Sequence, residues 1–479
     1  MRRYQGLFII TVLISLFGCA PALQQGAAKI GAVNIPNTLI KDNHAVSEDE
    51  AWTSMRHWWS IFQDSQLNAL LKDAYNNNPG IAEAVSRIRV AQAEVTSVTA
   101  TQYPSVYSGS SLSHQHYSSN SDHAIYNGDT YNLAILNPLD ISYHPDLWGS
   151  DHELVASNQA NLRVVRARLE KSEINLRQSV IKTYLALKVS YQIVMAQQQV
   201  IKLTSKINRV KQVAYDVGLR PASYLIPGEI NISESSAALS FATQQERALY
   251  YALAALLGKG PDADILISNE FEVIPDQLPL PKELNLEFIS KRPDIQESLW
   301  RVREAFHLEQ VAQKAYYPNV NLRALLGFNS IGLSKLFQYD SVAYAAGPVV
   351  SLPIFDHKEL QGRFDASVAN HDALIYAYNQ TVLLAAKEVA TNLANMDKMK
   401  SMLAYKAIAF HERTNFLKVA KAEHANGLSD QIPFLEAQVA EKKAYIEYMQ
   451  SQLMWFYAIT DMASSIDGEL QEKVNDHKN

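Results

Sequence analysis

The stretch that decides the fold is LRQSVIKTYLALKVSY, Leu176–Tyr191. Its apolar residues recur at steps of three and four, the spacing that places side chains on one face of an α-helix. It lies within a run of 68 residues, 150 to 217, that contains neither glycine nor proline. At about 1.5 Å per residue this run would measure roughly 100 Å, far longer than an ordinary globular helix. The sequence therefore predicts a helix of coiled-coil length.

A second run of 64 residues, 363 to 426, is also free of glycine and proline. Each run ends at a glycine turn and is followed by a further helical pattern, over 229–257 and 434–467. Each long helix and its successor are therefore predicted to form an antiparallel hairpin. The polar faces of these helices are rich in Gln, Asn and Ser. Such faces are exposed to bulk solvent or line a water-filled space, and periodicity alone does not separate the two.

The chain repeats itself once. Asn78-Pro79-Gly80-Ile81 corresponds to Arg292-Pro293-Asp294-Ile295, an offset of 293 − 79 = 214. Tyr103-Pro104 and Tyr317-Pro318 show the same offset. Self-similarity of this kind indicates two structural repeats. The expected organisation is a signal peptide at 1–18, a lipid-anchored extension at 19–50, repeats at 51–273 and 283–468, a proline-rich linker at 274–282 and a polar tail at 469–479.

Each repeat also carries two strand-like segments. Apolar and polar residues alternate from Tyr131 to Tyr143, with tyrosines at both ends, as in a membrane β-strand with interfacial aromatic residues. Similar patterns, the first of them weaker, cover 106–117, 320–328 and 342–354. Four strands are too few to close a barrel, and an open edge in lipid leaves backbone groups unpaired. Either the strands form a soluble sheet or several chains contribute to one barrel.

The N-terminus has the pattern of a secretion signal. Arg2 and Arg3 precede an apolar run, Leu7–Phe17, which is shorter than a membrane-spanning helix. The only cysteine, Cys19, ends the sequence Leu-Phe-Gly-Cys, which resembles a bacterial lipobox despite the bulky Phe17. That resemblance implies a diacylated Cys19 as the mature N-terminus; the alternative is a buried thiol without a role. A single cysteine excludes a disulfide framework and a Cys-ligated zinc site.

The second half of the chain contains four recognisable motifs: ISKRPDI at Ile289–Ile295, GPVVSLPIFD at Gly347–Asp356, YNQTV at Tyr378–Val382 and the Asn426-Gly427-Leu428 turn. In this order and spacing they resemble the TolC-like outer-membrane efflux proteins, in the lipid-anchored OprM/NodT-type branch. The resemblance covers nearly the whole mature chain. It implies a mainly α protein with a membrane β part, in which two repeats of long helical hairpins form a periplasmic tunnel. Four strands per chain would complete a twelve-stranded outer-membrane barrel in a homotrimer.

The resemblance also implies partners and a function. The partners would be a periplasmic adapter (membrane fusion) protein, an inner-membrane pump and outer-membrane lipid. The expected role is a passive duct that exports small molecules in a tripartite, RND-type efflux system. Two rival hypotheses are an outer-membrane duct for type I protein secretion and a periplasmic lipoprotein scaffold that forms no pore.

Two groups of residues are candidates for functional roles in such a duct, one for docking the adapter and one for lining the constriction. The turns at Val217-Gly218-Leu219 and Gly427-Leu428 resemble the family's adapter-docking tips, although a glycine there also simply ends a helix. Relatives often place aspartates at the periplasmic constriction before the second tip. This sequence has instead Glu412, Thr414, Asn415, Lys418 and Lys421. These residues either line the pore and weaken cation preference, or face outward as solvated helix residues.

The sequence shows none of the enzyme motifs sought. It has no phosphate-binding glycine loop, no GxSxG elbow and no HExxH helix, so no catalytic residue, cofactor or resident metal is expected. Four histidines, His114, His116, His123 and His144, occur in and around the first strand pair. A metal is a minor alternative for His114 and His116, and a polar loop is the favoured one. The net charge of −6 argues against nucleic acid as a partner.

Overall fold

The computed structural model describes residues 27–31, 38–41, 57–120, 128–268, 271, 273–280, 283–285 and 289–467. Cys19 and His123, and with them the predicted signal peptide and most of the N-terminal extension, lie outside these residues. The chain divides into two compact units. Unit 1 comprises Met1–Ala32, Ser86–Arg166 and Glu297–Asn379, and unit 2 comprises Val33–Val85, Ala167–Gln296 and Gln380–Asn479.

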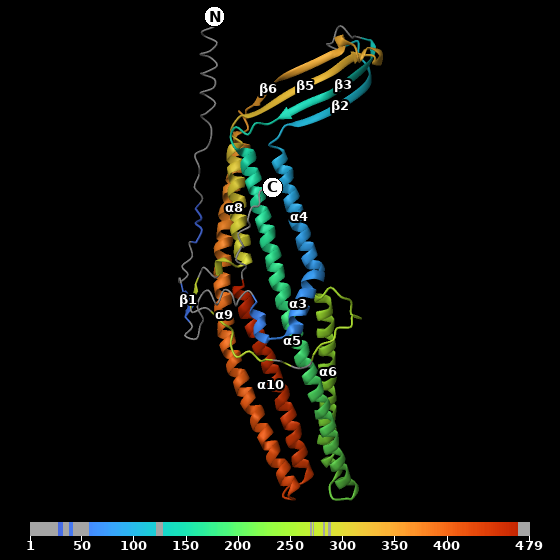
Figure 1. Ribbon diagram of the computed structural model, residues 1–479, viewed down its shortest axis with the longest axis vertical. Coiled ribbons are helices and arrows are strands. Elements are labelled where there is room, and N and C mark those ends of the chain that lie inside the picture. The colour runs from blue at the N-terminus through green and yellow to red at the C-terminus, as the bar shows by residue number, and fades with distance from the viewer. Residues whose placement is uncertain are drawn as a thin grey trace. The chain divides into compact units, whose positions relative to one another are not determined.

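The two predicted long helices are confirmed. Helix α5 spans Ser150–Asp216, 67 residues, and α9 spans His357–Ala425, 69 residues (Figure 1). Helix α5 fills almost all of its glycine- and proline-free run. Helix α9 begins six residues before its run, because Gly362 is accommodated within the helix at the modest cost of an interior glycine. Both helices begin in unit 1 and continue into unit 2.

Unit 2 contains the two predicted hairpins. Helix α6, Ile226–Leu256, lies beside the end of α5, and α10, Gln431–Ile466, lies beside the end of α9 (Figure 1). The rings of Phe410 on α9 and Tyr448 on α10 stack at 5.7 Å, and Lys406 pairs with Glu447 at 2.7 Å. Proline in the first turn of α6 is tolerated, because the first backbone N–H groups of a helix have no partner within it.

The internal repeat is visible in matching elements. Helices α4, Pro79–Ala100, and α8, Pro293–Lys314, are both 22 residues long and start at the proline of the repeated motif. Each is followed by a strand, and each strand pair leads into a long helix. The first repeat also contains η1, Trp58–Phe62, and α3, Ser65–Asn77, whose N-cap Asp64 accepts a hydrogen bond from Leu67 N at 3.0 Å.

The four predicted strands form one antiparallel sheet in unit 1. They are β2 Ser105–His116, β3 Thr130–Tyr143, β5 Asn319–Ile331 and β6 Val342–Ser351, in the order β2-β3-β5-β6 (Figure 1). The pairing shifts between Leu136 and Leu139, around Pro138, which cannot donate to the ladder. Within the described part of the chain, β2 and β6 each pair on one side only. Many large apolar side chains of the sheet are exposed, Tyr344 to 82%.

Shorter elements complete the described chain. Strands β1 Thr38–Lys41 and β4 Glu283–Asn285 form a separate antiparallel pair. Short 3₁₀ turns are η2 Ala222–Tyr224, η3 Leu333–Lys335 and η4 Tyr339–Ser341. None of the helices in the described residues combines the length and the apolar character needed to cross a bilayer.

The core of unit 2 gathers large side chains around the middle of α5 and the second half of α10, among them Trp58, Tyr184, Trp455 and Phe456. A buried ion pair lies within it: Lys188 Nζ is 3.0 Å from Asp64 Oδ2, which also accepts the Tyr184 hydroxyl at 2.8 Å. The proline-rich segment packs against this core, because Trp455 Nε1 donates to Pro275 O at 2.8 Å. Its leucines, Leu278 and Leu280, are buried.

Candidate functional site

The two predicted tips have the same local geometry. Gly218 and Gly427 both adopt φ of 74°, a left-handed conformation that favours glycine. The next residue then donates back across the last turn, Leu219 N to Ala214 O at 2.9 Å and Leu428 N to Glu423 O at 2.8 Å. This is the bond pattern of a Schellman helix end. Both leucines stay exposed, Leu219 to 75% and Leu428 to 79%, so each turn presents an apolar side chain to its surroundings.

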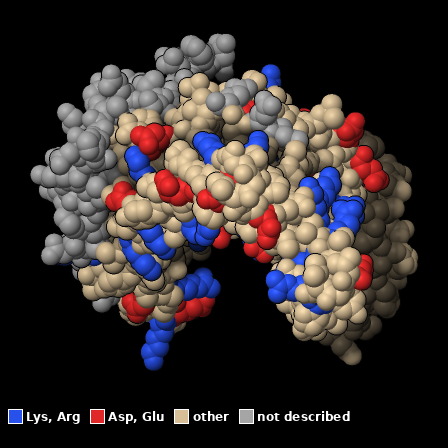
Figure 2. Space-filling view, turned by 90° about the horizontal axis from the view of Figure 1, so that it is seen from below, with Lys and Arg blue, Asp and Glu red and all other residues tan. Residues whose placement is uncertain are grey.

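The residues predicted for the constriction differ in their environments. Glu412 and Lys418 on α9 are exposed, and so is Lys421. Thr414 and Asn415 are half-buried, and the Thr414 hydroxyl donates to Phe410 O within its own helix at 3.0 Å. On the face shown in Figure 2, basic and acidic side chains are interspersed among large uncharged areas. Glu412, Lys418 and Lys421 are therefore the members of the group whose charges face away from the chain's own core.

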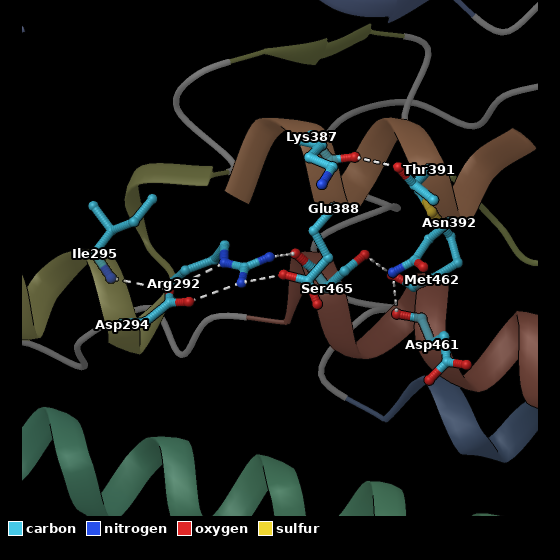
Figure 3. A network of polar contacts seen from close by, with 10 residues as sticks. All are labelled: Arg292, Asp294, Ile295, Lys387, Glu388, Thr391, Asn392, Asp461, Met462 and Ser465. Atoms are coloured by element: carbon cyan, nitrogen blue, oxygen red, sulfur yellow. Dashed lines mark hydrogen bonds and ion pairs between the residues drawn. The ribbon is translucent and has the colours of Figure 1, made fainter. Parts of the chain in front are cut away.

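A polar network in unit 2 centres on Arg292, within the ISKRPDI motif (Figure 3). Its Nε and Nη2 donate to the two carboxylate oxygens of Asp294 at 3.1 and 2.8 Å. Nη2 also donates to Glu388 on α9 at 2.7 Å, and Nη1 donates to Ser465 O on α10 at 2.6 Å. One planar guanidinium thus joins the start of α8 to α9 and α10. The sequence singles out the motif by its resemblance to a family, but the contacts of Arg292 with α9 and α10 become apparent only in the folded chain.

The electrostatics of the network favour its charged form. Burial raises the pKa of the Asp294 carboxyl, but the hydrogen bonds and charge of Arg292 outweigh burial and hold the pKa below its ordinary value. Burial likewise disfavours a charged Arg292, and Asp294 and Glu388 overcome it and raise the pKa of the guanidinium. A carboxylate with a lowered pKa stabilises the fold above its unfolded pKa of about 3.9, and the stabilisation is lost as the pH falls through the lower folded value.

A second set of contacts joins α5, α9 and α10 in unit 2. Asp461 on α10 accepts hydrogen bonds at its carboxylate from Gln178 at 2.6 Å and from Lys182, both on α5. Its backbone oxygen accepts from Asn392 of α9 at 3.2 Å (Figure 3). Arg177 of α5 pairs with Asp467 just beyond α10. Together with Arg292, these contacts form a belt of charged and amide groups that holds the long helices of unit 2 together.

The structure separates the histidines that the sequence groups together. His114 and His116 of β2 share a face and hydrogen-bond to Asn132 and Thr130 of β3 at 2.7 and 2.9 Å. His144 follows the opposite end of β3. His144 is therefore separated from His114 and His116 by the length of β3, a 14-residue strand. His144 instead lies with Asp146 and Asp151.

Two repeats, each a helix, a β-hairpin, a very long helix and a returning helix, define a protein with an internal duplication. The chain belongs to the outer membrane efflux protein family, whose model matches residues 70–259 and 287–460. Its place is therefore the outer membrane, and the family is one of channels.

Relatives and solved structures agree with this assignment. The chain is 22% identical over 474 residues to the multidrug resistance outer membrane protein MdtQ of Escherichia coli O157:H7, covering 97% of this chain and 98% of the relative. It is 26% identical to the multidrug resistance outer membrane protein MdtP of Escherichia coli strain K12, covering 90% and 88%. The crystal structure of the Campylobacter jejuni CmeC outer membrane channel superposes with a TM-score of 0.81 at 20% identity, covering 93% and 94%.

We predict that Arg292→Met strongly destabilises the protein. Removing one partner of a buried ion pair typically costs about 3–5 kcal/mol, because the other charge is left without compensation. Arg292→Lys should recover only part of the loss, since an ammonium group cannot reproduce the bidentate fork. The measurement is the thermal unfolding midpoint of the purified protein.

The matched control is Arg363→Met. Arg363 pairs with Glu359 one turn away on α9, and the two side chains are 70% and 61% exposed. An exposed pair contributes at most about 1 kcal/mol. Equal losses from Arg292→Met and Arg363→Met would contradict the structural role assigned to Arg292.

Proposed function

We propose that this protein is the passive outer-membrane duct of a tripartite efflux system of the RND type. The observation that carries the proposal combines two features: a four-stranded sheet whose edge strands, within the described residues, each pair on one side only, and helices of 67 and 69 residues. The sheet supplies only part of a closed barrel, while helices of that length extend roughly 100 Å. Membership of a family of outer-membrane efflux proteins supports this combination as a channel.

A homotrimer would complete the channel. Three copies would supply 3 × 4 = 12 strands, an even number within the range of closed outer-membrane barrels. Closure would pair β2 of one copy with β6 of the next, so that no edge is left open in lipid. The four helices of the two hairpins in each copy would give twelve helices around a common tunnel, with the polar faces rich in Gln and Asn facing water.

The proposed cargo is small molecules, and the proposed partners are a periplasmic adapter protein and an inner-membrane pump. The names of MdtQ and MdtP, multidrug resistance outer membrane proteins, favour drug-type export over the secretion of a protein substrate. The sequence contains no glycine loop for nucleotide binding, so the energy for transport would come from the pump. The adapter would bind at the tips, where Leu219 and Leu428 are exposed.

The purified protein is expected to form trimers that conduct ions in planar bilayers. If the residues before the second tip line the narrowest part of the duct, Lys418→Glu in each chain should shift the selectivity toward cations, because charge in a constriction acts on every passing ion. The measurement is the reversal potential across a salt gradient. Glu436→Lys, on the neighbouring α10, is a comparison for a charge change outside the proposed lining. Trimers without conductance would favour the scaffold hypothesis, and unchanged selectivity would remove Lys418 from the pore.

Adapter binding at the tips is tested by Leu219→Asp combined with Leu428→Asp. Both glycine turns stay intact, so the trimer should persist, while two apolar contacts per chain are replaced by charges. We expect drug export in a deletion strain to fall at least tenfold, together with loss of cross-linking to the adapter. Leu266→Asp is the matched control, because Leu266 is 80% exposed but lies outside both tips. Normal export by the double variant would argue against this docking surface.

We propose lipid anchoring through Cys19, on the evidence of its place after the apolar segment. Two acyl chains on one residue would provide stable anchoring. The mature protein is expected to begin at Cys19 and to carry acyl chains, as measured by mass spectrometry of the N-terminal peptide. Cys19→Ser should abolish this modification. An unmodified Cys19 in membrane-derived protein would be evidence against the anchor.

A further inference from the structure

The segment between β3 and α5, residues 144–149 in unit 1, holds a histidine whose ring contacts a backbone carbonyl. His144 Nδ1 lies 3.0 Å from Val320 O. A carbonyl oxygen only accepts hydrogen bonds, so Nδ1 carries the hydrogen and Nε2 of the neutral ring keeps its lone pair. A metal-binding histidine usually donates the hydrogen of its other ring nitrogen to a carboxylate, a backbone carbonyl or water, which fixes both the tautomer and the ring orientation.

The other ring nitrogen of His144, Nε2, lies near the carboxylate of Asp151. Nε2 lies 3.8 Å from Asp151 Oδ2, and one ligand atom from each of His144, Asp146 and Asp151 lies within 4.8 Å of the other two. All three residues are half-buried. A tetrahedral zinc ion with bonds of about 2.0–2.2 Å holds its ligand atoms roughly 3.4 Å apart. The three side chains therefore need only a small contraction to share one ion.

The charges in this cluster are not balanced by the cluster itself. Two carboxylates lie beside a single imidazole. A divalent cation would compensate both carboxylates at once. The side chain of Asp146 is held in place beside the cluster, because its Oδ2 accepts a hydrogen bond from His152 N in the first turn of α5 at 2.9 Å.

The backbone around the cluster is fixed by contacts outside it. Trp148 Nε1 donates to Pro318 O at 2.7 Å, and its ring stacks on Tyr317 at 5.1 Å. Lys314 Nζ donates to Gly149 O at 3.0 Å. The segment is thus tied to the end of α8 and the start of β5 as well as to its own helix. Ligands held in this way bind a metal with little ordering cost.

We propose that His144, Asp146 and Asp151 bind one divalent transition-metal ion, of the zinc class, at the junction of the sheet and the helices. One imidazole nitrogen and two carboxylate oxygens are ligands that suit Zn²⁺ and its neighbours, whereas Mg²⁺ and Ca²⁺ prefer oxygen ligands throughout. Water would occupy the remaining position. The ion would join the end of β3 to the first turn of α5. This site does not depend on the proposed efflux function, and its test needs no transport assay.

The test uses full-length, tag-free protein in detergent, treated with chelator and then titrated with Co²⁺, whose visible absorption reports ligand geometry. Calorimetric titration with Zn²⁺ gives the affinity and the number of ions. We expect one ion per chain, and we expect His144→Gln and Asp151→Asn each to weaken binding at least tenfold. Zn²⁺ should raise the thermal unfolding midpoint of the wild type and leave that of Asp151→Asn unchanged.

The matched control removes the other histidine pair of the sheet. His114→Gln combined with His116→Gln should bind as the wild type does. Asp151→Asn keeps the hydrogen bond between His144 and Val320. If His144→Gln fails to fold, metal binding by Asp151→Asn therefore still tests the site. Binding that survives both Asp151→Asn and His144→Gln, binding that is lost in the His114/His116 variant, or no binding at millimolar Zn²⁺ would each overturn the proposal.

Discussion

Backbone hydrogen bonding at the two edge strands is the constraint on which the rest of this molecule depends. In the described chain, β2 and β6 pair with a neighbour on one side only. In lipid, each backbone group left without a partner costs several kcal/mol, so a lone four-stranded sheet is not viable there. In the homotrimer that we propose, other copies would supply the missing partners. The exposed apolar side chains of the strands, such as Leu112 and Val350, suit the lipid-facing side of the barrel that we propose.

The need to pair the edge strands also affects where the long helices lie. Each strand pair leads directly into a long helix, so the proposed barrel closure would also gather α5 and α9 of every copy around one axis. In such an assembly, the belt of polar contacts in unit 2 would keep the helical hairpins of each chain in fixed positions. Arg292 and Asp461 each bond to more than one helix, and so fix how the hairpins of a chain stand beside one another. Such bonds are directional, whereas apolar packing alone would let long helices slide.

Much of this fold was accessible from the sequence because its signals are local. The two runs without glycine or proline predicted the long helices. Gly218 and Gly427 predicted where these helices end, since few other residues adopt a positive φ without strain. The alternation of apolar and polar residues predicted the four strands. The candidate sites were less accessible because they join distant segments. Arg292 meets Glu388, and His144 meets Val320, only after folding, and no periodicity encodes such pairs.

The distribution of burial along α10 indicates where the hairpin can move. In its first 18 residues, 431–448, four side chains are buried; in its last 18, 449–466, twelve are buried. Segments with few buried contacts open at lower free energy than the core of the same domain. Within one chain, the half of α10 nearest the Gly427 turn is therefore the half least held by packing, while the other half is held by the belt around Asp461. A duct that must open for its cargo would do so with least disruption at the tips, where the exposed leucines also lie.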